Sequence, residues 1–206
     1  MNNIYKKYIL AGLILLIGNL AYAQPAITLE AFGGWLWTSK AGYNGTIKVD
    51  DKGNYGVRGG ISHKSNMVVE FEWNHTETTL HWYDVIAAEN YSEDVTMNYF
   101  LLGYNQEVSD GPAIPYGVFN LGVMNLKSNV DSWSENWFTV GLGGGLKYYF
   151  SDHVGIRLQA RLFLPMQFAG VGFGCGSGGC GSGVSGYTST LQGDFTGGVV
   201  LKLGGG

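Results

Sequence analysis

Apolar and polar residues alternate along most of this chain, with the two-residue period of strands that have one apolar face. The clearest case is the stretch 141–163, where the pattern predicts two strands joined by the short turn Ser151-Asp152-His153. Successive side chains of a strand point to opposite faces, so the second strand has an aliphatic face and a face with two arginines and an amide. The aliphatic face holds Val154, Ile156, Leu158, Ala160, Leu162 and Leu164, and the other holds Gly155, Arg157, Gln159, Arg161 and Phe163.

The same alternation predicts eight strands and almost no helix after residue 23. Besides the pair in 141–163, strands are expected at 27–37, 55–63, 68–80, 95–107, 115–126 and 191–203. The faces of 95–107 stay unassigned, because Tyr99 to Leu102 are all apolar. The connections alternate in length: those at 63–67, 108–114 and 151–153 are tight, and those at 37–55, 83–94, 127–135 and 169–189 are longer.

Alternation alone is compatible with two kinds of sheet. In a soluble sheet the aliphatic face would be the core, whereas in an outer-membrane barrel it would meet lipid and the charged face would line the interior. Short turns at one edge and longer loops at the other are typical of the membrane barrel. The pattern therefore predicts an all-β chain that forms an eight-stranded antiparallel transmembrane β-barrel with up-and-down topology.

The first residues have the features of an export signal. Lys6 and Lys7 precede an apolar run at 8–17, and Ala21-Tyr22-Ala23 follows at the position of a cleavage site. We therefore predict a signal peptide at 1–23 and the barrel domain at 24–206. The apolar run is short for a membrane anchor, and no later stretch predicts a transmembrane helix. An even strand number then places the mature N-terminus in the periplasm of a Gram-negative bacterium, with the barrel in its outer membrane.

Composition narrows the choice of partners and cofactors. The chain has 12 basic and 16 acidic residues; loss of Lys6 and Lys7 leaves 10 minus 16, a net charge of −6, which argues against a nucleic-acid partner. Cys175 and Cys180 are the two cysteines, and in an exported protein they are a candidate disulfide. No third cysteine or histidine accompanies them, so we predict no metal site there and no cofactor.

The predicted inward faces carry charges of both signs. An eight-stranded barrel is just wide enough for its own side chains to fill it, and buried charges must be paired. We therefore expect a salt-bridged interior network, and a narrow ion pathway or gate is the alternative. Its predicted members are Glu30, Arg58, Glu70, Glu72, Lys147, Arg157 and Arg161.

Aromatic residues near the strand ends predict two belts at the membrane interfaces, because such rings are apolar in body with a polar edge. The belt at the long-loop end is expected to contain Trp35, Trp37 and Trp137. The belt at the short-turn end is expected to contain Tyr148 and Phe150, with Tyr116 as a further candidate.

Two other groups of residues raise the question of a metal or catalytic site. His75, Glu77 and His81 share a strand face, but residues six positions apart on a strand are separated by about 20 Å, too far to share one ion. Ser151-Asp152-His153 occupies a tight turn, where serine and aspartate are common turn formers. We predict neither a metal site nor a catalytic site.

The hairpin at 141–163 resembles the matching region of the small eight-stranded outer-membrane β-barrels, which group the opacity-protein-like surface antigens with the transmembrane domain of outer-membrane protein A. The first similar strand has the pattern G-x-G-x-K-Y-x-F, made by Gly143, Gly145, Lys147, Tyr148 and Phe150. The second has the pattern R-L-x-A-R, made by Arg157, Leu158, Ala160 and Arg161. As a strand pattern, the resemblance extends over the whole mature chain.

Two features depart from that family. Its members usually end in an aromatic residue that the assembly machinery reads, whereas this sequence ends in Leu201-Lys202-Leu203 and three glycines. No peptidoglycan-binding domain follows the barrel, so cell-wall tethering is not expected.

The resemblance implies a non-enzymatic integral outer-membrane protein with a structural or surface-interaction role, such as adhesion or envelope integrity. Its expected partners are outer-membrane lipid, lipopolysaccharide and the barrel-assembly machinery; the external ligand is not indicated. Two alternatives remain open: a narrow porin-like channel for small solutes or apolar compounds, and a lipid-modifying outer-membrane enzyme.

Overall fold

The computed structural model describes residues 26–40, 47–63, 66–84, 89–109, 111–176, 179–188 and 190–204; residues 63, 84, 167–176 and 179–188 are described by their backbone only. The predicted signal peptide at 1–23 lies outside these residues. Within the part of the chain that is described, no helix is both long enough and apolar enough to cross a membrane.

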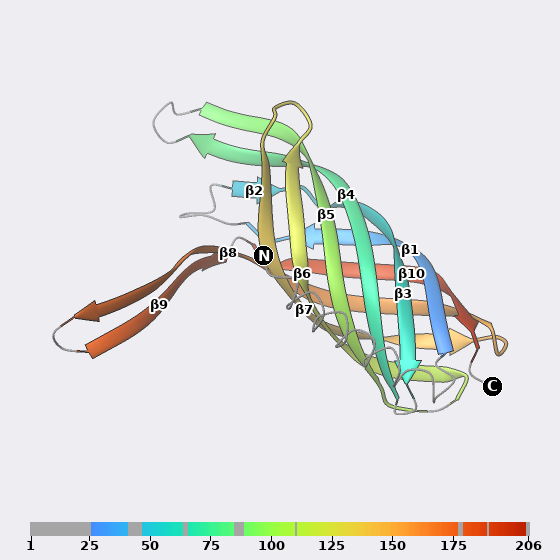
Figure 1. Ribbon diagram of the computed structural model, residues 1–206. Helices are drawn as coiled ribbons and strands as arrows, with labels where there is room; N and C mark the ends of the chain where they lie inside the picture. Colours follow the sequence, from blue (N-terminus) through green and yellow to red (C-terminus); the bar gives the residue numbers. More distant parts are fainter. Residues whose placement is uncertain are drawn as a thin grey trace, which may run out of the picture.

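Eight strands pair side by side into a closed ring (Figure 1). Every pairing is antiparallel, and β10 pairs with both β8 and β1, which closes the barrel. The prediction of an eight-stranded antiparallel up-and-down barrel is therefore confirmed. The ring consists of β1 (Ala26–Thr38), β3 (Lys52–His63), β4 (Met67–Asp84), β5 (Glu89–Glu107), β6 (Ala113–Ser128), β7 (Ser134–Tyr149), β8 (Val154–Gly176) and β10 (Gln192–Leu203).

Two further strands lie where long loops were predicted. β2 (Ile47–Val49) pairs with the outer part of β4, and β9 (Gly179–Thr188) pairs with the outer part of β8. Most of the predicted loop at 83–94 likewise belongs to β4 and β5. The prediction of long loops is wrong there: these segments continue the backbone ladder, although their short, glycine-rich or largely polar sequences show no clear two-residue alternation.

The tight turns lie together at the opposite end of the barrel. Asn66, in the turn between β3 and β4, has a positive φ of 41°, a conformation that asparagine adopts more readily than most residues. Its carbonyl accepts the backbone N–H of Glu107 at 2.7 Å. In the turn between β7 and β8, the Ser151 hydroxyl oxygen accepts the backbone N–H groups of His153 at 3.4 Å and Val154 at 3.2 Å. Ser151 is thus used to shape the turn.

The outer wall of the barrel is apolar. The aliphatic set at 154–164 faces outward as predicted, and its ten residue steps span roughly 25 Å of barrel height at the usual strand tilt. Across β4, β5, β6 and β7 this wall ends at one level. Paired positions there change from Trp73, Phe100, Val123 and Phe138 to His75, Asn98, Asn125 and Asn136.

The barrel is taller on one side, although its apolar wall is not. β4, β5 and β8 have 18, 19 and 23 residues, whereas β1, β3 and β10 have 13, 12 and 12. The extra length lies beyond the polar row, at the long-loop end, and the β4–β5 and β6–β7 hairpins project there in Figure 1. The β8–β9 hairpin leans away from the barrel in the same view.

Candidate functional site

The predicted interior charges all lie inside the barrel. The strand period turns one side chain in two inward, and the register then sets these residues beside one another: Glu30 is opposite Arg58, Arg58 is opposite Glu72, and Lys147 is opposite Arg157. All seven predicted residues are buried. The structure therefore brings together the complete predicted set.

Arg157 occupies the middle of this network. Its Nη1 lies 2.8 and 2.9 Å from the two carboxylate oxygens of Glu70 and 3.2 Å from Glu30 Oε2. Arg58 continues the network, with Nη1 at 2.6 Å from Glu30 Oε1 and Nε at 2.7 Å from Glu72 Oε2. Each guanidinium therefore joins two carboxylates.

Two acids that were not predicted complete the network. Arg161 joins Glu72 at 2.7 Å to Asp194 at 2.6 Å, and Lys147 joins Glu70 at 3.8 Å to Glu107 at 2.7 Å. The signal for Asp194 was present, because it alternates with the apolar Phe195. Glu107 follows the stretch whose faces could not be assigned from the sequence.

The ion pairs form one continuous chain of alternating sign. It contains five acids and four bases, and the described contacts leave no member of it without an oppositely charged neighbour. Such pairing is what permits ionised groups to be buried. In order, the residues of this ion-pair chain are Glu107, Lys147, Glu70, Arg157, Glu30, Arg58, Glu72, Arg161 and Asp194.

Each of the three arginines also lies over an aromatic ring. The guanidinium carbon is 3.8 Å from the ring centroid of Phe32 for Arg58, 4.6 Å from that of Tyr116 for Arg157, and 4.6 Å from that of Phe163 for Arg161. Tyr116 was a candidate for an outer belt, and that prediction is wrong: it lies inside, where its hydroxyl accepts the Arg157 Nε–H at 2.6 Å and donates to Gln159 at 2.7 Å.

Each of these rings covers a glycine on the neighbouring strand. A methyl group built on Gly56 would lie 2.6 Å from the Phe32 ring, one on Gly145 would lie 2.8 Å from the Tyr116 ring, and one on Gly141 would lie 2.9 Å from the Phe163 ring. The repeated unit is therefore a glycine, an aromatic ring above it and an arginine above the ring. It leaves the rings room to lie flat in a narrow barrel.

The interior beyond Asp194, toward the long-loop end, contains an apolar cluster, with buried polar side chains such as Thr76, Thr78 and Gln192 beside it. Tyr99 and Phe163 stack there with ring centroids 5.3 Å apart, and the Tyr99 hydroxyl donates to Gln192 at 2.6 Å. Val49 of β2 packs on the same cluster, so the added strand covers the mouth on that side. This layer was not predicted from the sequence. Its buried members are Leu36, Val49, Met97, Tyr99, Leu101, Met124 and Phe163.

The predicted aromatic belts are only partly correct. Trp35, Trp37, Tyr148 and Phe150 point outward. Trp137 does not: it packs on the apolar interior cluster, and its neighbour Phe138 takes the outward position. Two adjacent aromatic residues do not reveal which of them faces outward, whereas the pairing of Phe138 with outward Val123 in the ladder decides it.

A further interface group forms around β3 and β4. The Tyr55 ring lies 6.2 Å from Trp73 and 5.0 Å from His75. The Trp73 indole donates to Asn98 Oδ1 at 3.3 Å, and His75 Nδ1 lies 2.9 Å from the same oxygen. These side chains mark where the apolar wall ends.

The two histidines of β4 have separate partners. His75 Nε2 lies 3.6 Å from Glu77, and His81 Nε2 lies 3.2 Å from Asp50 Oδ2. The hydrogen bond from the His81 ring holds the pKa of the Asp50 carboxyl below its usual value of 3.8. Among the described residues, no three His, Cys, Asp or Glu side chains are grouped so as to hold a metal ion.

The cysteines lie in the β8–β9 hairpin. The ladder sets Cys175 directly opposite Cys180. Their side chains lie outside the described part of the structure, so the disulfide stays a prediction.

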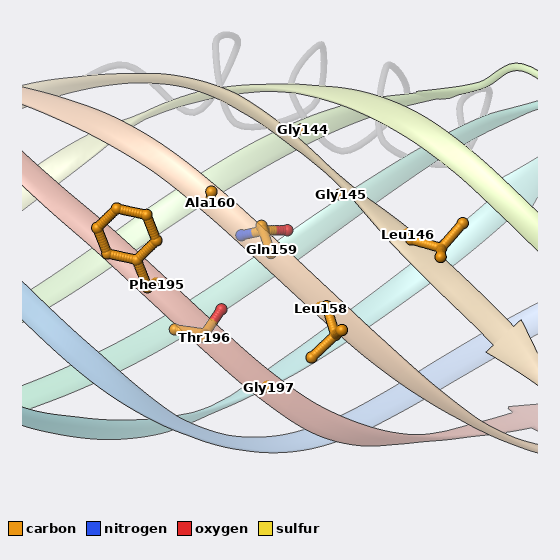
Figure 2. Close-up of a pocket in the computed structure, with 9 residues that line it drawn as sticks. All are labelled: Gly144, Gly145, Leu146, Leu158, Gln159, Ala160, Phe195, Thr196 and Gly197. Atoms are coloured by element: carbon orange, nitrogen blue, oxygen red, sulfur yellow. The ribbon is translucent and has the colours of Figure 1, made fainter.

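The outer wall has a groove of about 510 Å³ across β7, β8 and β10. Figure 2 shows Leu146, Leu158 and Phe195 around it, with Gly144, Ala160 and Gly197 between them. Small residues on three adjacent strands leave this hollow. Its walls are apolar, like the rest of the outer face.

An apolar outer wall around an ionic interior is stable only where hydrocarbon surrounds the barrel, since water would favour the reverse arrangement. The family model of the outer membrane protein beta-barrel domain matches residues 11–202 of the sequence. The chain belongs to this family. Outer-membrane barrels of this kind lie in Gram-negative envelopes, which places the protein in that membrane.

Solved structures with the same fold have little sequence in common with this outer-membrane barrel. Neisserial surface protein A is 13% identical, over 86% of this chain and 99% of that chain, with a TM-score of 0.56. OprG of Pseudomonas aeruginosa is 12% identical over 88% and 96%, with a TM-score of 0.54. A major outer membrane protein of Thermus thermophilus is 12% identical over 87% and 99%, with a TM-score of 0.52. No curated protein matches the sequence.

Proposed function

We propose that this protein is a closed, non-enzymatic outer-membrane barrel with a structural or surface-interaction role in adhesion or envelope integrity. The observation that carries the proposal is the filled interior. The nine-residue ion-pair chain and the apolar cluster beyond it occupy the bore of a barrel that is just wide enough for its own side chains. Because these side chains fill the interior, no continuous path for solutes is expected through the barrel.

The proposal includes an orientation. The short turns and both termini of the mature chain lie in the periplasm, and the tall β4–β8 wall projects from the cell surface. The apolar wall contacts outer-membrane lipid and lipopolysaccharide, and the barrel-assembly machinery inserts the chain. At the short turn the Ser151 hydroxyl accepts two backbone N–H groups, which supports a structural role for this serine as a turn former.

Planar-bilayer conductance tests the closed barrel. The purified full-length protein is added to a bilayer, with a known porin as the positive control under the same conditions. We expect no conductance steps from the wild-type protein. Reproducible steps from the wild-type protein would show that the interior conducts, and the channel alternative would replace this proposal.

A deletion strain tests the enzymatic alternative. We expect the mass spectrum of its lipid A to match that of the parent strain. A changed spectrum that returns to normal when the gene is restored would overturn the non-enzymatic role. For orientation, a protease-cleavable tag placed in the β6–β7 loop is expected to be cut in intact cells, and a tag in the β7–β8 turn is not.

A further inference from the structure

A polar cavity of about 530 Å³ lies at the long-loop end, between the tips of β6 and β7. Its lining combines one indole ring with hydroxyl, amide, carboxylate and ammonium groups. These come from Trp133, Ser132, Ser134, Asn129, Asp131 and Lys127. The cavity does not belong to the interior network, so the closed barrel does not explain it.

Hydrogen bonds around the buried Ser128 hydroxyl fix the shape of this cavity. The Ser128 hydroxyl is buried; its oxygen accepts the backbone N–H groups of Val130 at 3.1 Å and Asp131 at 2.7 Å, and the hydroxyl donates to Glu93. The same Glu93 oxygen accepts the Trp133 indole N–H at 3.1 Å. The ring is therefore held by its polar edge, in place before any ligand arrives, which lowers the entropic cost of binding.

The charge of the lining selects among ligand classes. Lys127 and Asp131 are the charged residues of the lining, and the adjoining Glu93 carboxylate is already bonded to Ser128 and Trp133, so the cavity has no excess positive charge for phosphate. A wholly apolar ligand would leave the hydroxyl and amide groups without partners. A sugar ring meets both demands, because it offers a C–H face to the indole and several hydroxyls to the polar groups.

The position of the cavity agrees with this ligand class. Asn125 and Asn136 belong to the polar row that ends the apolar wall, and Asn125 Nδ2 donates to Ser134 Oγ at 2.9 Å and to Asn136 Oδ1 at 2.8 Å. The cavity thus begins where the hydrocarbon region ends. Saccharides are available there from two sources, the sugars of lipopolysaccharide and free oligosaccharides outside the cell.

We infer that the cavity between β6 and β7 is a saccharide-binding site in which the Trp133 ring is the stacking surface. The inference rests on the proposed surface role, since it names the class of ligand that the exposed end takes. Ser132, Ser134, Asn129 and Asp131 supply hydrogen bonds to the sugar hydroxyls.

Binding to the purified full-length protein in phospholipid nanodiscs tests the site. The probes are maltotriose, chitotriose, and phospholipid vesicles with and without lipopolysaccharide. We expect saturable binding to a trisaccharide, to lipopolysaccharide vesicles, or to both. A soluble trisaccharide identifies a free ligand, and binding confined to lipopolysaccharide vesicles identifies a membrane-borne one.

Variants separate the site from general surface contact. Trp133→Ala is expected to weaken binding at least about tenfold, and Trp133→Phe, which keeps an aromatic face, by no more than about threefold. Trp82→Ala, which removes an indole stacked on Tyr91 in the β4–β5 hairpin, is the matched control and leaves binding unchanged. Ser132→Trp fills the cavity without removing the Ser128 and Glu93 bonds, and it abolishes binding even if Trp133→Ala does not fold.

Two results would overturn the inference: no binding of any probe, or equal binding by the wild-type protein and a folded Ser132→Trp variant. Either result leaves the closed barrel intact, because conductance is measured separately. Conductance by the wild-type protein would overturn the proposed function and leave the binding result standing.

Discussion

The interior of this barrel has two halves built from the same strands. Toward the short turns, inward side chains form the ion-pair chain from Glu107 to Asp194. Toward the long loops, most of the large inward side chains form the apolar cluster around Tyr99 and Leu101, and buried threonines and Gln192 lie beside it. On β8 the change occurs within two residues, from Arg161 to Phe163. Strand alternation therefore decides which side chains point inward but leaves open how the interior is held together.

The two halves of the interior are stabilised by different interactions. In the ionic half, burial penalises every charge, and only an oppositely charged partner in good geometry offsets that penalty. In the apolar half, the condition is volume, since transfer from water and close packing supply the stabilisation. We therefore expect the ionic half to depend on the identity of each group and the apolar half to depend on its size.

Removing Arg157 is expected to have the largest effect. Arg157→Ala leaves Glu30 and Glu70 buried without their shared partner, and breaking such a pair costs about 3–5 kcal/mol. The free energy of unfolding in urea, measured for the protein in lipid vesicles, checks this value. Arg157→Lys is also expected to be destabilising, because an ammonium cannot reproduce the contacts to Glu70, Glu30 and the Tyr116 hydroxyl together.

Lys202→Ala is the control, since this partly exposed lysine lies outside the ion-pair chain. A double variant, Arg157→Gln with Glu70→Gln, is expected to be less destabilised than the sum of its two single variants. Equal stability of the Arg157→Ala and Lys202→Ala proteins would contradict the ionic half as described.

The apolar half is expected to tolerate a change of shape but not of size. Leu101 is fully buried in the cluster, so Leu101→Ala leaves a cavity and costs about 2–5 kcal/mol, whereas Leu101→Met keeps the volume and costs less than about 1.5 kcal/mol. The same urea titration measures both. Leu102→Ala is the matched control on the outer face, where lipid chains fill the gap. Similar losses for the alanine and methionine variants would show that volume does not govern this half.

Glycines lie under aromatic rings in both halves: Phe163 belongs to the apolar cluster, and Tyr116 is bonded to Arg157 of the ion-pair chain. A methyl group on Gly145 would overlap the Leu158 carbonyl oxygen, so Gly145→Ala must move the backbone and is expected to cost about 1–3 kcal/mol. Gly117 on the adjacent strand has nothing within 4 Å of such a methyl group, and Gly117→Ala is expected to change stability by less than about 0.5 kcal/mol. If both variants unfold at the same urea concentration, the stacking unit is not under steric constraint.

The smallest effect is expected at the end of β2, where Asp50 contacts His81 of β4. Because contact with His81 lowers the pKa of Asp50, this contact stabilises the fold at pH values above about 4 and is lost as the pH falls through the lowered value. An NMR titration of the Asp50 carboxyl is expected to give a pKa below 3.8, and His81→Asn is expected to return it toward 3.8. A pKa that is the same in both proteins would remove His81 as the cause.

The barrel, its strand number and most members of the ionic set could be predicted from the amino-acid sequence. These follow from local information, because the two-residue period assigns each side chain to a face and the turn residues set the end of each strand. That period placed Glu30, Glu70, Glu72, Arg157 and Arg161 on the polar faces of their strands, and the alternating loop lengths then assigned those faces to the interior. Where successive residues are all apolar, the alternation does not show which of them face inward. For this reason Tyr99, Leu101 and Trp137 were not placed inside.

Which charges meet depends on the closed barrel. Arg157 and Glu30 are 127 positions apart, and they touch because β10 closes the ring between β8 and β1. Closure also brought Asp194 to Arg161, and the pairing of β2 with β4 brought Val49 onto the apolar cluster. The lining of the β6–β7 cavity is local in sequence, but its shape depends on Glu93 from β5. The alternation within a strand sets a direction for each side chain, and the closure and register of the barrel set its partners.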